Sequence, residues 1–147
     1  MAKFKFSLEN LLQIKYKLED QAKAEYGLEM AKLQQEEARL KQLQERKDTL
    51  QAQLTEAVVS VLDLLRIRRL EDGVENIKYN MNLQRVVIAK QKDRTDRARA
   101  KLDEAMKERK TYEKLKEKAF EVFKQEVNAA EQKEVDELVS FRFGNTE

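Results

Sequence analysis

The sequence predicts an all-α fold, namely a long two-helix antiparallel coiled-coil hairpin, and three observations carry this prediction. The 147 residues include only 3 glycines and no proline, so few turns are expected, because turns recruit these residues. Charged residues make up 39% of the chain and apolar residues 41%, a balance typical of long helices with a narrow apolar seam. The apolar residues recur in alternating steps of three and four, along two lattices of different phase.

The first helix is expected to begin close to the N-terminus and to cover about residues 7–57. Ser7 can act as N-cap by accepting a hydrogen bond from a free backbone N–H. Phe6 and Leu11 then have the spacing of a hydrophobic staple around that cap.

The first lattice of core positions fits a heptad pattern in the second half of this helix. Further upstream, Leu11, Ala22 and Leu33 recur every eleven residues, so we expect the coil to straighten toward its N-terminal end. The heptad positions are Leu33, Glu36, Leu40, Leu43, Lys47, Leu50, Leu54, Ala57, Val61 and Leu64.

The second lattice is longer and runs without a slip. Its small and polar members, from Gln84 to Arg109, predict a loosely packed middle section, because a seam built only for stability carries Leu or Ile there. Neutral drift in a coil that is stable enough anyway would give the same pattern. The positions are Ile67, Leu70, Val74, Ile77, Met81, Gln84, Ile88, Gln91, Thr95, Ala98, Leu102, Ala105, Arg109 and Tyr112.

Because the two lattices differ in phase, either a turn or a jump in register is required between about Ala57 and Ile67, and two places compete for the turn. Asp72-Gly73 is a strong turn signal, but the second lattice passes straight through Gly73. The other place is residues 58–63, where Ser60 can cap the second helix with Asp63 as the acidic partner of a capping box. We favour the turn at about 58–63, which makes Gly73 a helix-interior glycine.

The chain is therefore expected to form a single coiled-coil domain over 1–147, with the second helix covering about residues 64–141. This helix is longer than the first, and its end beyond about Lys118 still carries an apolar stripe. A stripe without an intramolecular partner is a candidate binding surface, although frayed last turns or a misplaced turn would produce the same pattern. Its members are Ala119, Phe123, Val127, Ala130, Leu138 and Phe141.

The sequence does not indicate an enzyme, a metal site or a cofactor. Histidine and cysteine are absent, which removes the usual proton shuttle, thiolate nucleophile and soft metal ligands. The three scattered glycines form no phosphate-binding loop. Carboxylates alternate with lysines in the manner of surface i,i+4 pairs.

Nucleic acid is not an expected partner either. The most basic stretch, from Lys90 to Lys101, is interrupted by Asp93 and Asp96, whereas a nucleic-acid surface favours an unbroken basic face. A second cluster near the turn, made of Arg66, Arg68 and Arg69, either meets an acidic partner or forms a solvated helix start.

The sequence favours a cytoplasmic location. The N-terminus lacks the apolar stretch of a signal peptide, and no stretch approaches the ~20 apolar residues of a spanning helix. The absence of cysteine fits a reducing compartment.

Three segments resemble the FliJ family of flagellar export proteins. They are residues 4–15 (FKFSLENLLQIK), 112–118 (YEKLKEK) and 131–137 (EQKEVDE), and the resemblance extends over essentially the whole chain. It implies a soluble component of the flagellar type III protein export apparatus, whose two-helix coiled coil is similar to the gamma-subunit stalk of rotary ATPases.

The resemblance also implies partners and contact residues. The partners are the hexameric flagellar export ATPase, the cytoplasmic domain of the membrane export gate, and export chaperones. Membrane association would be peripheral, at the inner face of the cell membrane at the flagellar base and through partners only. The expected gate contacts are Leu70, Gly73, Val74 and Ile77, and the expected contacts with the ATPase ring are Phe4, Phe6, Leu11, Tyr112, Leu115 and Lys116. Relatives often carry an aromatic residue at the position of Gly73.

Two other functions use the same architecture. One is a generic coiled-coil scaffold or prefoldin-like chaperone, and the other is a stalk subunit of a true rotary ATPase.

Overall fold

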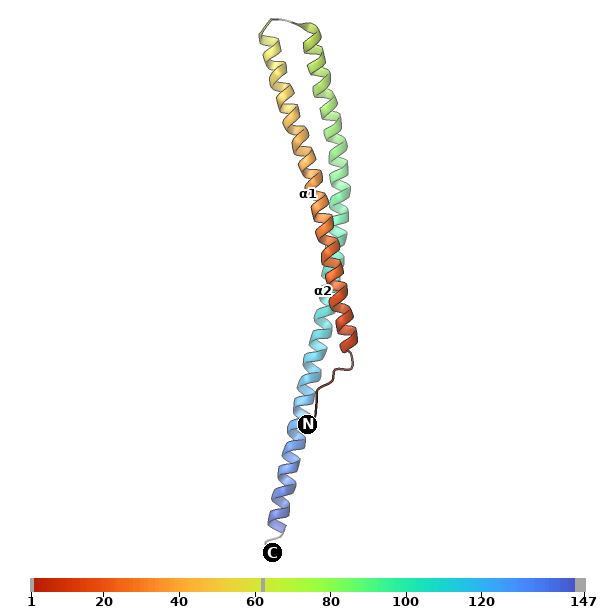
Figure 1. The fold of residues 1–147 in the computed structure, drawn as a ribbon, viewed down its shortest axis with the longest axis vertical. Helices are drawn as coiled ribbons and strands as arrows, with labels where there is room; N and C mark the ends of the chain where they lie inside the picture. The colour runs from red at the N-terminus through yellow and green to blue at the C-terminus, as the bar shows by residue number, and fades with distance from the viewer. Residues whose placement is uncertain (1, 62, 145–147) are drawn as a thin grey trace. The chain divides into compact units, whose positions relative to one another are not determined.

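A computed structural model describes residues 2–61 and 63–144 and confirms the two-helix hairpin. Helix α1 covers Glu9–Val59 and helix α2 covers Leu64–Gly144, joined by a short connection (Figure 1). Within the described residues there is no β-strand.

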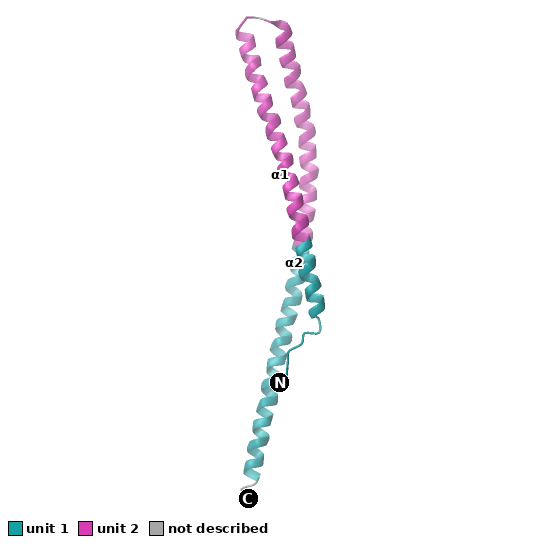
Figure 2. Ribbon diagram, viewed as in Figure 1, with its two compact units in different colours: residues 1–21, 103–147 teal, residues 22–102 magenta. Residues whose placement is uncertain are grey.

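The chain divides into two compact units, which are described separately (Figure 2). Unit 1 combines residues 1–21 with 103–147, and unit 2 covers residues 22–102. In each unit a stretch of α1 packs against a stretch of α2.

The connection between the helices differs from the expected capping arrangement. The backbone N–H of Ser60 donates to the carbonyl of Glu56 at 3.0 Å, so Ser60 closes the last turn of α1. Asp63 caps α2 instead, because its Oδ1 accepts a hydrogen bond from the backbone N–H of Arg66 at 3.2 Å. The prediction of Ser60 as N-cap is therefore wrong.

The start of α1 also differs by one residue from expectation. The first i→i+4 hydrogen bond runs from the N–H of Leu12 to the carbonyl of Leu8 at 2.9 Å, which puts Leu8 and not Ser7 in the N-cap position. A tight turn precedes it, closed by the N–H of Glu9 and the carbonyl of Phe6 at 3.1 Å.

The second lattice is confirmed, because every one of its positions from Ile67 to Tyr112 is buried or half-buried. Its largest apolar members in unit 2 form the core with Ala22 and Ala57 of α1. The helix continues through Gly73, so the alternative turn at Asp72-Gly73 is excluded.

The first lattice is confirmed from Leu33 to Ala57 and fails beyond it. Val61 and Leu64 are 92% and 76% exposed, since α1 ends at Val59 and these side chains belong to the connection and the first residue of α2.

The N-terminal half of α1 keeps the heptad spacing rather than an eleven-residue one. Leu12, Glu19, Tyr26 and Leu33 follow at steps of seven, and all four are buried or half-buried. Leu12 is 2% exposed, whereas its neighbour Leu11 is 41% exposed. The sequence did not reveal this heptad register, because a charged residue, Glu19, occupies one of its seam positions.

In unit 1 the N-terminal segment covers part of the stripe that was expected to lack a partner. The ring of Phe4 lies 5.2 Å from that of Phe120 and 5.5 Å from that of Phe123, measured between centroids. The first three stripe positions, Ala119, Phe123 and Val127, are half-buried. The remaining ones, Ala130, Leu138 and Phe141, are exposed.

Candidate functional site

In unit 1 a charged cluster crosses the seam between the helices. Arg109 donates to both carboxylate oxygens of Glu19, through Nε to Oε2 at 2.7 Å and through Nη2 to Oε1 at 3.2 Å. Its Nη1 also donates to Glu113 at 3.0 Å, and the hydroxyl of Tyr16 donates to Glu113 at 2.6 Å. Such a forked, multiply bonded arrangement fixes the relative position of the two helix stretches in this unit.

The hydrogen bonds of this cluster shift the acidity of its members. The hydroxyl of Tyr16, followed by the guanidinium of Arg109, lowers the pKa of Glu113 below its usual range. The same contact with Glu113 raises the pKa of Tyr16. Glu19 and then Glu113 raise the pKa of Arg109, so it stays charged.

Unit 2 contains two polar contacts of the same form, one heptad apart. The Nε2 of Gln84 donates to the backbone carbonyl of Glu36 at 2.9 Å and to its carboxylate at 2.6 Å. Gln91 makes the same pair of bonds to Glu29, with 3.1 Å to the carbonyl. Here the bond from Gln91 lowers the pKa of Glu29.

These contacts show that three polar positions of the section expected to pack loosely have partners across the seam. Gln84, Gln91 and Arg109 had the appearance of weak seam residues, but each is a donor to a glutamate on α1. Part-buried polar pairs of this kind favour one register, because sliding one helix past the other would leave these groups without partners.

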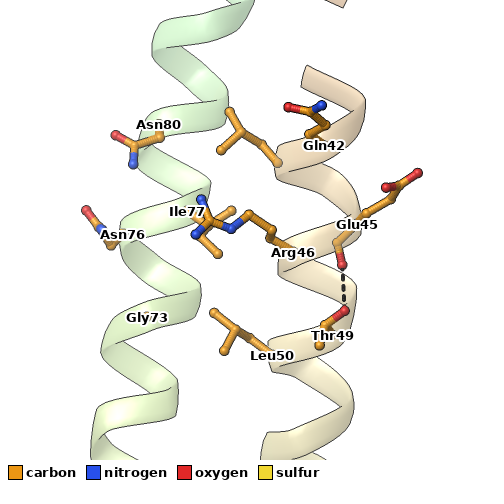
Figure 3. Close-up of a pocket in the computed structure, with 10 residues that line it drawn as sticks. Gln42, Glu45, Arg46, Thr49, Leu50, Gly73, Asn76, Ile77 and Asn80 are labelled. Carbon is orange, nitrogen blue, oxygen red and sulfur yellow. Dashed lines mark hydrogen bonds between the residues drawn. The ribbon is translucent and has the colours of Figure 1, made fainter. Parts of the chain in front are cut away.

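The residues expected to contact the export gate lie together on the seam of unit 2. Val74 and Ile77 are buried, while Leu70 and Gly73 are half-buried. Of the four, Gly73 and Ile77 also line a surface groove of about 730 Å³ (Figure 3). Opposite Gly73, the side chain of Leu50 approaches from α1, and a Cβ at residue 73 would lie 3.3 Å from its Cδ1.

Just beyond this stretch, the exposed side of α2 carries apolar residues that were not predicted from the sequence. Tyr79 is 63% exposed, and Leu83 and Val86 are about half exposed. Their spacing of four and three places them on one helix face. The spacing of these three residues is visible in the sequence, but the three- and four-residue steps of the buried seam run through the same region and were followed instead.

The residues expected to contact the ATPase ring lie in unit 1, and the fold brings three of them together. Phe4, Phe6 and Lys116 line a small pocket of about 370 Å³, together with Lys5 and Glu9. Lys116 forms an ion pair with Glu9 at 2.8 Å, and this contact lowers the pKa of Glu9.

The other three ring candidates lie outside this pocket. Tyr112 is half-buried in the seam, with Nζ of Lys15 at 5.6 Å from its ring centroid. Leu11 and Leu115 are exposed on the surface of α1 and α2, respectively.

Among residues 2–61 and 63–144, no group of three or more carboxylate, imidazole or thiol side chains could hold a metal ion. Neither helix formed by these residues contains the long, nearly uncharged apolar run that spanning a bilayer requires.

Comparison with known proteins places this hairpin in a family. The model of the flagellar FliJ protein family matches residues 4–147. The flagellar FliJ protein of Bacillus subtilis (strain 168) is 26% identical over 136 residues, which is 92% of this chain and 92% of that protein. No solved structure matches the chain. With the family model matched from the aromatic N-terminal segment to the end of the sequence, the chain belongs to the FliJ family.

Proposed function

We propose that this component of flagellar protein export acts as a non-catalytic stalk, which binds the hexameric export ATPase and the export gate and supports delivery of chaperones and their substrates. The observation that carries the proposal is the family match over residues 4–147, on a chain that folds as a two-helix hairpin. The protein would act in the cytoplasm, at the inner face of the cell membrane at the flagellar base.

The ATPase ring would contact unit 1, at Phe4, Phe6, Leu11, Tyr112, Leu115 and Lys116. Two features support this surface. Leu11 and Leu115 are exposed apolar side chains on the two helices of the unit, and partners favour such anchors. The ion pair of Glu9 and Lys116 holds the start of α1 against α2, which makes the surface preorganised.

The gate would contact the stretch of α2 from Leu70 to Ile77 and the exposed face beside it. Because Val74 and Ile77 are buried between the helices, they would position the contact rather than make most of it. The groove at Gly73 and the exposed side chains of Tyr79 and Leu83 offer the surface that a partner can reach.

Export chaperones would use another surface. The exposed part of the C-terminal stripe, represented by Leu138 and Phe141, has no helix packed on it within the described part of unit 1. Exposed apolar residues on one helix end suit a helical or grooved chaperone partner.

The rate of ATP hydrolysis by the export ATPase directly tests whether this chain acts as a stalk. The purified chain, added at about one copy per ring, should raise the turnover of the cognate hexameric export ATPase and favour ring assembly. The double variant Leu11→Asp, Leu115→Asp should lose this stimulation while keeping its helicity, because both side chains are exposed. Leu28→Asp, at an exposed site in unit 2, is the matched control. A parent chain that leaves turnover unchanged contradicts the stalk and favours the scaffold function.

A second pair of variants tests the gate contact. Tyr79→Asp should weaken binding to the cytoplasmic domain of the gate by about 1–3 kcal/mol with unchanged thermal stability. Ile77→Asp should instead lower the stability of the hairpin, because it buries a carboxylate in the seam. If the parent and the Tyr79→Asp variant bind the gate with equal affinity, the exposed face of α2 that carries Tyr79 does not contact the gate.

A further inference from the structure

The connection between α1 and α2 carries the most exposed large apolar side chains in the described part of the chain. Val61, Val59 and Leu64 are 92%, 84% and 76% exposed. Val58 and Leu65 beside them are more than half exposed. All five are aliphatic and belong to the end of α1, the connection and the start of α2. The chain reverses at this end of unit 2 (Figure 2). Together they form what is here named the apex.

Three arginines follow the apex within the first two turns of α2. Arg66, Arg68 and Arg69 are all exposed, and none forms an ion pair with another described residue. Glu56 and Asp63 precede these arginines, and Glu71 and Asp72 follow them on α2, so the three arginines are the charged residues of α2 nearest to the aliphatic side chains. The apex is therefore an aliphatic patch whose border on α2 is cationic.

We propose that the apex binds directly to the surface of an anionic lipid bilayer. At a rise of 1.5 Å per residue, Arg66 to Arg69 lie about 3–8 Å along α2 from Leu64. Interfacial segments bury their apolar side about 5–10 Å into the boundary between headgroups and acyl chains. Aliphatic side chains inserted to that depth bring the guanidinium groups level with the lipid phosphates, which they bind through charge-assisted hydrogen bonds.

The composition of the apex favours a bilayer over an acidic protein. Among the residues that dominate binding at protein interfaces, aromatic side chains are enriched, whereas leucine and valine are under-represented. Residues 58–69 contain no aromatic side chain, and a lipid surface needs none to accept valine and leucine. Asp63 limits the depth of insertion, because its carboxylate stays at the connection as the cap of α2. Binding is consequently superficial, reversible and salt-dependent. This contact is direct, whereas the family resemblance implied membrane association through partners only.

Vesicle co-sedimentation with the full chain tests the proposal. The parent should bind vesicles enriched in phosphatidylglycerol, bind vesicles of phosphatidylcholine much less, and be released by high salt. The double variant Val61→Asp, Leu64→Asp should lose binding and keep its helicity, because both side chains are exposed. Leu28→Asp, an exposed apolar site elsewhere in unit 2, should bind as the parent does.

The arginines are tested separately. Arg66→Ala and Arg69→Ala should each lower the apparent affinity for anionic vesicles about fivefold. Arg99→Ala, at an exposed position distant in sequence from the apex, should change it far less.

Three results would overturn the proposal. One is no binding of the parent to anionic vesicles at low salt. Another is binding of the double variant Val61→Asp, Leu64→Asp to anionic vesicles as strongly as the parent binds. The third is apex-dependent binding to soluble polyglutamate without binding to vesicles, which would assign the surface to an acidic protein.

Discussion

Arg109 of α2 holds Glu19 of α1 in a two-pronged hydrogen bond, at 2.7 and 3.2 Å, inside the seam of unit 1. Glu19 is only 5% exposed. A carboxylate at that depth is tolerable because the planar guanidinium satisfies both of its oxygens. The pair shows why a charged residue can occupy a core position of this coiled coil.

Removing one member of the pair should therefore cost more than removing both. Arg109→Leu leaves the buried carboxylate of Glu19 without its guanidinium and should lower the melting temperature by several degrees. The double variant Glu19→Leu, Arg109→Leu should melt at or above the parental temperature, because apolar residues can replace a buried ion pair. Thermal unfolding followed by circular dichroism measures both.

The surface pair of Glu75 and Lys78 is the matched control, since both side chains are largely exposed. Lys78→Leu should leave the melting temperature nearly unchanged. Equal effects of Arg109→Leu and Lys78→Leu would contradict the structural role of the fork.

The two helix-interior glycines should respond differently to alanine. A Cβ at residue 27 would meet no atom within 4 Å outside its own stretch of helix, so Gly27→Ala should raise the free energy of unfolding by about 1 kcal/mol through helix propensity. Gly73→Ala gains the same propensity but places a methyl group 3.3 Å from Cδ1 of Leu50. Because that atom ends a flexible side chain beside an open groove, we expect a smaller net gain of about 0.5 kcal/mol. Urea unfolding measures both values, and a destabilising Gly73→Ala would contradict the predicted accommodation by Leu50.

The cap of α2 can be identified by comparing two neighbours. Asp63→Ala removes the hydrogen bond to the N–H of Arg66 and should cost about 1 kcal/mol of stability. Ser60→Ala should change stability by less than about 0.5 kcal/mol, because the side chain of Ser60 is exposed at the end of α1. The reverse order of the two effects would restore Ser60 as the cap.

Stability should fall on both sides of neutral pH. The pKa values of Glu29 and Glu113 are lowered from the ordinary 4.5 in the fold, so their stabilisation is present above about pH 4.5 and disappears as the pH falls through the folded values. The pKa values of Tyr16 and Lys15 are raised above 10.0 and 10.5, so their stabilisation is present below those values and is lost as the pH rises further.

The melting temperature at low salt should accordingly be highest between about pH 5 and 10. Gln91→Leu removes the main cause of the lowered pKa of Glu29 and should weaken the acid dependence. A melting temperature that rises as the pH is lowered from 5 to 3 would contradict these assignments.

The sequence predicted the seam of α2 from Ile67 to Tyr112, because its three- and four-residue steps run without interruption over these residues. It missed the partners of the polar seam residues. That Gln84 lies opposite Glu36 depends on where the chain reverses, and a shift of the turn would pair it with another residue.

The ends of α1 show a second limit of sequence reasoning. Leu11 and Leu12 are equally apolar, and only the heptad that includes Glu19 decides which one is buried. Ser60 and Asp63 are both good caps, and the hydrogen bond to Arg66 N–H selects one of them. The residues proposed to contact the ATPase ring and the export gate remain predictions, because each contact depends on the partner protein as well as on this chain.

The hairpin itself is tested most directly by a distance between two spin labels in unit 2, at the exposed positions Gln35 and Arg85. Packed helices have axes about 8–10 Å apart, so labels on neighbouring helices should lie within about 25 Å of each other. This distance should persist when labelled chains are diluted with unlabelled ones, because it lies within one molecule. A separation of about 75 Å, the length of fifty residues of continuous helix, would contradict the hairpin, as would a short distance that disappears on dilution.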